Sequence, residues 1–228
     1  MKKSELHLFI LWEKARIHEQ KILKDISTKF EILRVFNQTW SEDMFSNNLS
    51  RLYGKRLLKS HKKKEKAGSG AFLTIVVRDN NPLMIDGINS KPFESKSLYR
   101  QWTGGGHLVH CSDNIDEAEE NMMFLLGLNS KEFLAKYNSA WDGSYININQ
   151  EIIGSPEWNN ETSFQNFIKK IPEATVKSVQ NTLLITHQDV QKISRLLNAT
   201  KKLFFMRRNM YQVPINGKNK MIYIRKPI

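Results

Sequence analysis

The chain has 228 residues and a mass of 26.6 kDa, and its 40% hydrophobic and 25% charged residues are typical of a folded globular protein and not of a disordered one. Its apolar runs fall short of the roughly 18 residues of a membrane-spanning helix, and the run near the amino terminus has no signal-peptide cleavage site. The single cysteine, Cys111, excludes an intramolecular disulfide and predicts a reducing, cytoplasmic setting.

The net charge of +12 is unevenly distributed along the chain. Residues 55–66 carry a net charge of +6 and residues 201–228 a net charge of +8, which leaves −2 for the rest. Such patches attract nucleic acids, phosphate-bearing substrates or the anionic inner face of a membrane, although a solvated surface also has such runs. The residues expected to bind polyanions are Lys62, Lys63, Lys64, Arg207 and Arg208.

The first 36 residues predict a strand, a helix and a second strand. Residues 6–12 are a continuous apolar run, which is typical of a strand buried on both faces. Ala15, Ile22 and Ile26 then share one helical face, and residues 30–36 return to a strand pattern. This βαβ order predicts that the first strand is internal in the sheet and parallel to the second.

The middle of the chain continues the alternation of helices and strands. A second helix is expected between Ser41 and Gly54, followed by a lysine-rich loop and a strand over residues 71–79. Turn residues then lead into a short helix over 94–102 and a strand over 107–111.

Later helix and turn signals are local. A helix is expected between Asn114 and Gly127, with acidic residues in its first turns that complement the helix dipole. Loops with a short strand or helical turn follow Trp141, and a further helix begins after Thr186. The Asn-Gly pair at 216–217 predicts a hairpin.

Together these elements predict an α/β fold with a mixed, mainly parallel sheet, flanking helices and a C-terminal basic β-hairpin, with an α+β fold as the alternative. Residues 1–143 are expected to form the α/β core domain with the glycine-rich loop. Residues 144–228 are expected to form a smaller mixed segment that ends in the basic hairpin.

Three consecutive glycines, Gly104, Gly105 and Gly106, follow Thr103 and precede His107. Glycine adopts positive φ without strain, so this backbone is predicted to approach and bind a phosphate group. His107 beside it is the main candidate for general acid–base catalysis. The alternative is a tight turn next to a histidine that is satisfied by hydrogen bonds.

Four more residues are candidates for the same site. His110 faces the opposite side of a regular strand from His107, so we expect it to lie deeper, as a second catalytic residue or in the core. Arg100, one helical turn upstream, is expected to bind an anion. Glu13 lies where open α/β sheets bind ligands, and Lys55 is expected to contact an anionic substrate.

Several familiar sites do not fit the sequence. The glycine run is neither a Walker loop nor a dinucleotide-binding fingerprint. A nucleotidyltransferase pattern with Asp79 lacks its second carboxylate, because position 81 is Asn. Strand alternation separates the His and Cys residues near Cys111, so no metal site is predicted and no cofactor is indicated.

The segments LHLFILWEKA, NLSRLYG, GSGAF and LYRQWTGGGHLVH, followed by FLLGLN, resemble a bacterial family. Its members occur alone or as amino-terminal modules of larger proteins in capsule or lipopolysaccharide gene clusters. The resemblance covers residues 6–143, and the chain departs from the family in a lysine insertion at 59–66 and an acid-rich helix at 116–120. The resemblance implies a phosphorylated or nucleotide-activated glycan precursor as substrate.

Two functions remain as hypotheses. The first is a phospho- or glycosyl-type transferase of surface-polysaccharide biosynthesis, in which the glycine run and Arg100 bind phosphate and His107 shuttles a proton. The alternative is a basic nucleic-acid-binding protein or a metal-independent nuclease, in which arginine and aromatic residues of 201–226 contact phosphates and bases.

Overall fold

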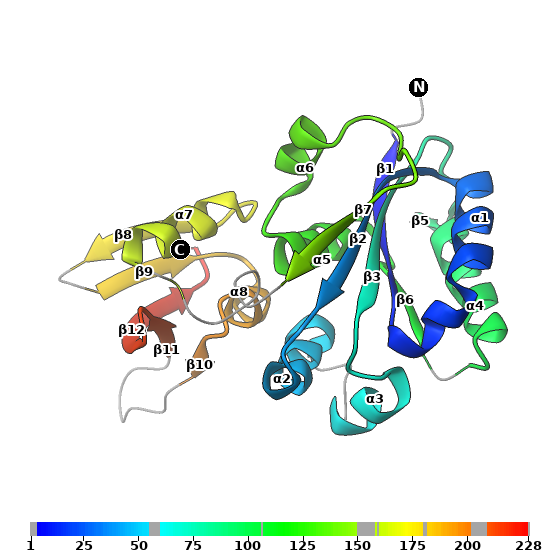
Figure 1. Ribbon diagram of the computed structural model, residues 1–228. Helices are drawn as coiled ribbons and strands as arrows, with labels where there is room; N and C mark the ends of the chain where they lie inside the picture. Colours follow the sequence, from blue (N-terminus) through cyan, green and yellow to red (C-terminus); the bar gives the residue numbers. More distant parts are fainter. Residues whose placement is uncertain are drawn as a thin grey trace.

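The computed structural model of the protein contains two five-stranded sheets, a short hairpin and flanking helices (Figure 1). It describes residues 4–54, 60–105, 107–149, 158, 160–179, 182–201 and 209–227. No helix among these residues is both long enough and apolar enough to cross a membrane.

The first sheet has the strand order β6-β1-β3-β2-β7. Its strands are β1 (Glu5–Leu11), β2 (Glu31–Thr39), β3 (Phe72–Asp79), β6 (Val109–Cys111) and β7 (Tyr145–Asn149). β1 pairs antiparallel with β3 and β6, β2 pairs antiparallel with β3, and β2 pairs parallel with β7. The mixed α/β fold is therefore confirmed, but the expected predominance of parallel neighbours is corrected to antiparallel.

β1 is internal, as predicted, and it runs in the same direction as β2. The two strands are not neighbours, however, because β3 lies between them and pairs with both. β3 is apolar and almost entirely buried, which suits it to this central position. β1 lies between β3 and β6 in the same way, so the sheet contains two split βαβ units, as in ferredoxin-like folds.

Helices cover both faces of the first sheet (Figure 1). One face carries the 3₁₀ helix η1 (Glu13–His18), α1 (Glu19–Lys29) and α4 (Ser90–Trp102). The other carries α2 (Glu42–Tyr53), α5 (Ile115–Leu126) and α6 (Ser130–Lys136). Leu8 and Ile10 of β1 face the second group of helices, and Phe9 and Leu11 face the first. Because both faces are covered, β1 is apolar from Leu8 to its end at Leu11.

The lysine run forms a helix, α3 (Ser60–Ala67), and the expectation of a loop there is wrong. Lys, Glu and Ala are strong helix formers, and α3 packs beside α2 and η1 at one end of the first sheet (Figure 1). A short hairpin of β4 (Met84–Ile85) and β5 (Ile88–Asn89) precedes α4.

The second sheet has the order β10-β11-β12-β9-β8. Its strands are β8 (Thr175–Val179), β9 (Thr182–Thr186), β10 (Thr200–Lys201), β11 (Met210–Ile215) and β12 (Lys218–Arg225). The antiparallel pair of β11 and β12 turns at Asn216 and Gly217, both with positive φ, which confirms the predicted C-terminal hairpin.

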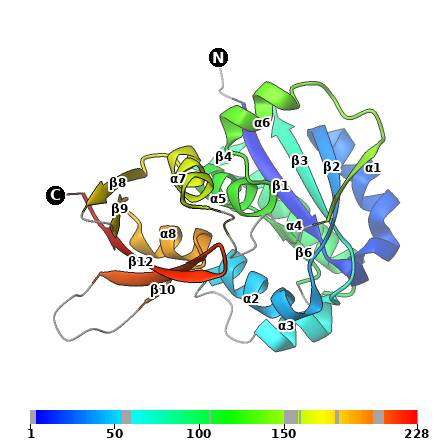
Figure 2. The same ribbon diagram turned by 60° about the vertical axis from the view of Figure 1, so that its left-hand side comes forward.

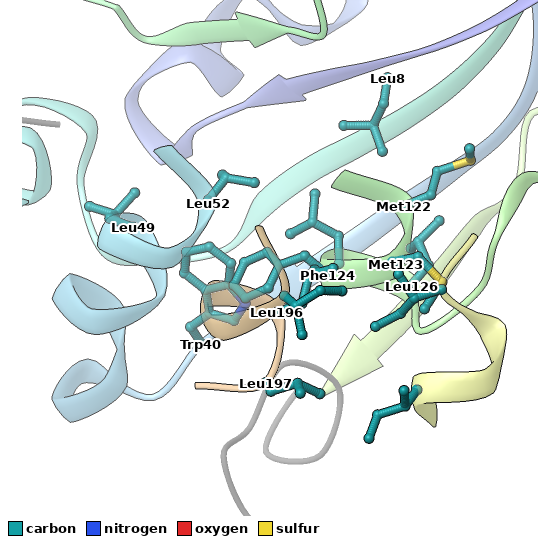
Figure 3. Packing of buried hydrophobic residues seen from close by; sticks show 14 of the residues in the cluster. Leu8, Trp40, Leu49, Leu52, Met122, Met123, Phe124, Leu126, Leu196 and Leu197 are labelled. Atoms are coloured by element: carbon teal, nitrogen blue, oxygen red, sulfur yellow. The ribbon is translucent and has the colours of Figure 1, made fainter. Parts of the chain in front are cut away.

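The two sheets share one hydrophobic core. Two further helices, α7 (Glu161–Lys170) and α8 (Val190–Leu196), precede and follow the hairpin of β8 and β9. α8 lies between the second sheet and helices α2 and α5 (Figures 1 and 2). Leu196 and Leu197 pack there with Trp40, Leu49 and Phe124 (Figure 3).

Candidate functional site

Three basic side chains meet near the start of β6, and we call Lys63 of α3, Arg100 of α4 and His107 of the segment between α4 and β6 the cationic cluster. Lys63 of α3 donates a hydrogen bond from its Nζ to the main-chain oxygen of His107. Arg100 of α4 donates from its Nε to the main-chain oxygen of Val109, at 3.0 Å. The charges of Arg100 and Lys63 also act on the His107 ring, so the three groups share one electrostatic environment.

Lys63 is buried, with only 9% of its surface exposed. Its Nζ lies 5.8 Å from the ring centroid of Trp12 and 5.3 Å from that of Tyr53. Burial, together with the positive charge of Arg100, lowers the pKa of the Lys63 ammonium to about 7.

The three central lysines of the run therefore differ in their surroundings. Lys62 is exposed, Lys64 forms an ion pair with Glu42 at 3.1 Å, and Lys63 points inward. The expectation that Lys63 is a surface contact for polyanions is corrected, because α3 turns it toward the core on the same face as buried Ala67.

His107 has a left-handed backbone, with φ of 63°, and an exposed side chain. This conformation is uncommon for a residue other than glycine. Partial burial of the imidazole and the charges of Arg100 and Lys63 lower its pKa below the ordinary value of 6.5. The ring is therefore predominantly neutral at pH 7 and can accept a proton.

The glycine run ends helix α4. The amides of Thr103, Gly104 and Gly105 donate to the carbonyls of Tyr99, Gln101 and Arg100. The Thr103 hydroxyl donates to the carbonyls of Tyr99 and Arg100 as well. These groups thus complete the last turn of α4, and their predicted role as phosphate ligands stays a prediction. Gly106 lies outside the described residues.

His110 is buried, as predicted, on the face of β6 opposite to Val109 and Cys111. The Asn121 amide nitrogen donates to His110 Nε2 at 3.0 Å, which places the ring proton on Nδ1. The His110 ring meets the Tyr53 ring edge-on, with centroids 5.2 Å apart. Its catalytic role stays a prediction.

Glu13 supports the loop that precedes β3. Its carboxylate accepts a hydrogen bond from the Gly70 amide at 2.7 Å. A Cβ at Gly70 would lie 2.7 Å from the Glu13 carboxyl carbon, so only glycine fits here without a shift. The predicted contact of Glu13 with substrate stays a prediction, and Lys55, Arg207 and Arg208 lie outside the described residues.

Two cations of α4 cover the outer edge of β6. Lys96 donates to the Cys111 carbonyl at 3.4 Å, and Arg100 to the Val109 carbonyl, which protects this edge strand. Lys96 also forms an ion pair with Asp113. Within the described part of the chain, by contrast, no carboxylate forms an ion pair with a member of the cationic cluster.

An open cavity of about 460 Å³ has Arg100 of the cationic cluster in its wall, together with the ion pair of Lys96 and Asp113. Ile85, Ile88 and Phe93 line it, and all three have strongly exposed side chains. Among the described residues, no group of three or more His, Cys, Asp or Glu side chains could hold a metal ion.

Sequence reasoning missed the aromatic residues of the site. Trp12 and Tyr53 are 41 positions apart, and they are joined by a 3.1 Å hydrogen bond from the Trp12 indole to the Tyr53 hydroxyl. The sequence contained one local indication that Lys63 is buried. Lys63 and the apolar Ala67 are four residues apart, so they share a face if the run is helical.

No family model matches the chain, and no curated protein matches it. Among solved structures, it is similar to the nucleoside diphosphate kinase of Aquifex aeolicus, with 18% sequence identity and a TM-score of 0.40 over 57% of this chain and 99% of that one. It is also similar to the nucleoside diphosphate kinase of Encephalitozoon cuniculi, with 16% identity and a TM-score of 0.37 over 54% of this chain and 89% of that one. At these TM-scores the likeness carries no argument about activity.

Proposed function

We propose that the protein is an enzyme that acts on a phosphorylated or nucleotide-activated substrate, and that the cationic cluster binds the phosphate. One observation carries the proposal: three basic side chains, from α3, from α4 and from the segment before β6, lie together and form no ion pair with a carboxylate in the described part of the chain. The positive charge of Arg100 disfavours a charged Lys63, and a bound phosphate would offset this repulsion.

The members of the cationic cluster suit different tasks. With its Nε bound to the main-chain oxygen of Val109, the Arg100 guanidinium has two terminal nitrogens that suit phosphate oxygens. The largely neutral His107 ring is suited to take a proton from a nucleophile and return it to a leaving group. The cavity that Arg100 lines, with Ile85, Ile88 and Phe93 as its apolar part, would hold the rest of the substrate.

Binding of phosphate compounds tests the proposal. Calorimetric titration with inorganic phosphate, pyrophosphate, a nucleoside diphosphate and a nucleotide-sugar should show binding to the wild-type protein. Arg100→Gln should weaken it by about tenfold to a hundredfold, since a charged hydrogen bond contributes about 1.5–3 kcal/mol. Lys62→Gln, on the exposed face of α3, is the matched control and should bind normally. Equal affinities for Arg100→Gln and wild type would contradict the proposal.

A role in surface-polysaccharide biosynthesis is the finer part of the proposal, and it is supported by the sequence resemblance. The nucleotide-sugar distinguishes it from other phosphate chemistry, because a glycosyl-type transferase should bind this compound more tightly than the nucleoside diphosphate alone. Peripheral contact with an anionic membrane belongs to the same proposal.

Nucleic-acid binding is the second candidate, and the exposed Lys62 with the basic hairpin favours it. Against a large contribution from α3, Lys63 is buried and Lys64 is paired with Glu42. Retention on heparin and on single-stranded oligonucleotides should fall with salt if this candidate holds. If the wild-type protein binds oligonucleotides but none of the phosphate compounds, the nucleic-acid-binding function is favoured over the enzymatic one.

A further inference from the structure

Lys63 differs from the other buried lysine of this region in its partners. Lys96, which is 6% exposed, has the carboxylate of Asp113 as its counter-ion. Lys63, which is 9% exposed, has the rings of Trp12 and Tyr53 and the main-chain oxygen of His107 instead. An amine in such an apolar and carboxylate-free position is disposed to lose its proton.

The charged and titratable groups around Lys63 act in the same direction. Arg100 of α4 adds its positive charge to the effect of burial, and the pKa of the Lys63 ammonium falls to about 7. The other titratable groups near Lys63 are His107 and Tyr53 of α2, and Lys66 of α3 and Lys96 of α4 also act on the His107 ring. At pH 7 about half of the Lys63 side chains are neutral, against fewer than about one in a thousand for an ordinary lysine.

We propose that Lys63 is a nucleophile that forms an imine with the carbonyl carbon of a phosphorylated aldehyde or ketone. The inference rests on the proposed function, because Arg100 would hold the phosphate of this compound. It narrows the substrate class from phosphorylated compounds in general to those with a carbonyl group.

The reaction balances without an oxidant or reductant. The neutral Nζ of Lys63 attacks the carbonyl carbon, the carbonyl oxygen takes up a proton, and Nζ loses one to give a carbinolamine. Loss of water from the carbinolamine then forms the C=N bond, so that an amine and a carbonyl compound give an imine and water. We assign the proton transfers to the His107 ring, which lies within the electrostatic reach of Lys63.

The chain around the main-chain oxygen that Lys63 contacts is open to solvent. His107 and Gly104 are exposed. No atom lies within 4 Å of the position that a Cβ would occupy at Gly104 or at Gly105. Space is therefore open over Gly104 and Gly105, a few residues before His107 in the chain.

Trapping with pyridoxal 5′-phosphate, a phosphorylated aldehyde, tests the inference. The full-length protein is incubated with this probe or with pyridoxal, reduced with borohydride, digested and mapped by mass spectrometry. We expect saturable labelling of Lys63 that inorganic phosphate inhibits and that is at least tenfold weaker with pyridoxal. The rate of Lys63 labelling should reach half its maximum near pH 7. The rate of labelling of an exposed lysine should instead keep rising above pH 9.

Three variants sharpen the test. Lys63→Gln should abolish the label while circular dichroism shows a folded protein, and Lys62→Gln should keep it. Arg100→Gln should reduce labelling by pyridoxal 5′-phosphate to the level of pyridoxal. This last variant keeps Lys63 in place and so serves if Lys63→Gln fails to fold.

The inference is overturned if the label spreads over exposed lysines such as Lys62, or if pyridoxal labels Lys63 as well as its phosphate ester does. Normal binding of inorganic phosphate without any imine would overturn this inference alone. Absence of phosphate binding would overturn the proposed function.

Discussion

At the scale of the residue, the site depends on one amine that the fold holds in an unfavourable environment. Burial and Arg100 lower the pKa of Lys63 from 10.5 to about 7. This shift corresponds to a cost of about 5 kcal/mol for keeping the amine charged in the folded protein. A methionine would fill the same space without this cost. A lysine in such a position therefore points to a function that requires its amine.

The cost predicts how stability depends on pH. Below pH 7 both the folded and the unfolded protein bind the Lys63 proton, and the folded protein bears the full cost. Between pH 7 and about 10.4 only the unfolded chain binds it, so stability rises with pH. Lys63→Met should therefore stabilise the protein most below pH 7, and this gain should shrink toward pH 10.

Urea unfolding of wild type and Lys63→Met between pH 6 and pH 10 measures this difference. Lys62→Met is the control, since Lys62 is exposed and its replacement should give a small difference that does not vary with pH. A constant difference between wild type and Lys63→Met over this range would show that Lys63 keeps an ordinary pKa.

His110 is expected to act on stability and not on phosphate binding. Its ring is 6% exposed and fills space beside Tyr53, and its loss would leave the Asn121 amide without this acceptor. His110→Ala should lower the free energy of unfolding by about 2–4 kcal/mol. Thermal unfolding measures the stability of the His110→Ala variant, and calorimetric titration measures its phosphate binding. A variant of normal stability that binds no phosphate would contradict this prediction and place His110 in the binding site.

At the scale of the element, the end of helix α4 positions two members of the cationic cluster. Arg100 lies in its last turn, and His107 follows the turn formed by the glycine run. Gly104 and Gly105 have φ of 77° and 82°, and their amides bond to carbonyls of α4. The left-handed Gly104 and Gly105 therefore close the last turn of α4 shortly before His107.

Gly105→Ala should destabilise the protein by about 1–2 kcal/mol through its backbone alone, because space around the new Cβ is open. Asn tolerates this conformation better, so Gly105→Asn should cost less. Thermal unfolding compares the two variants. The affinity for phosphate should also fall with Gly105→Ala. Equal stability of the alanine and asparagine variants would mean that the turn adapts to a side chain.

At the scale of the whole molecule, Arg51 joins the two sheets. This residue of α2 is 6% exposed and donates to the carbonyls of Arg195 and Leu196 at the end of α8, at 3.0 and 2.8 Å. Its guanidinium lies 4.7 Å from the ring centroid of Phe124, and burial lowers its pKa to about 9. The contact thus unites α2, α5 and α8 in the shared core.

Arg51→Met should lower the free energy of unfolding by about 2–4 kcal/mol, because two buried carbonyls lose their donor. Hydrogen exchange should increase in β9 and β12, which pair with each other in the sheet that α8 supports. Lys64→Met removes an ion pair with the largely exposed Glu42 and should cost less than about 1 kcal/mol. Equal losses for both variants would mean that Arg51 is no more important than a surface charge.

The sequence by itself determined the features that short segments encode. Asn114 and Gly127 bound helix α5, and the Asn-Gly pair at 216–217 turns the C-terminal hairpin, as predicted. The continuous apolar run of β1 also identified an internal strand. These features follow from a cap, a backbone angle or a burial pattern, each of which depends on residues next to one another in the chain.

Only the tertiary structure decided which segments lie side by side. β3 separates β1 from β2 because it pairs with both, and no local pattern in β1 or β2 records this. Likewise, Lys63 meets Trp12, Arg100 and His107 across up to 51 positions of sequence. Its low pKa arises from desolvation and from the charge of Arg100, and both exist only after helices α3 and α4 have packed on the sheet.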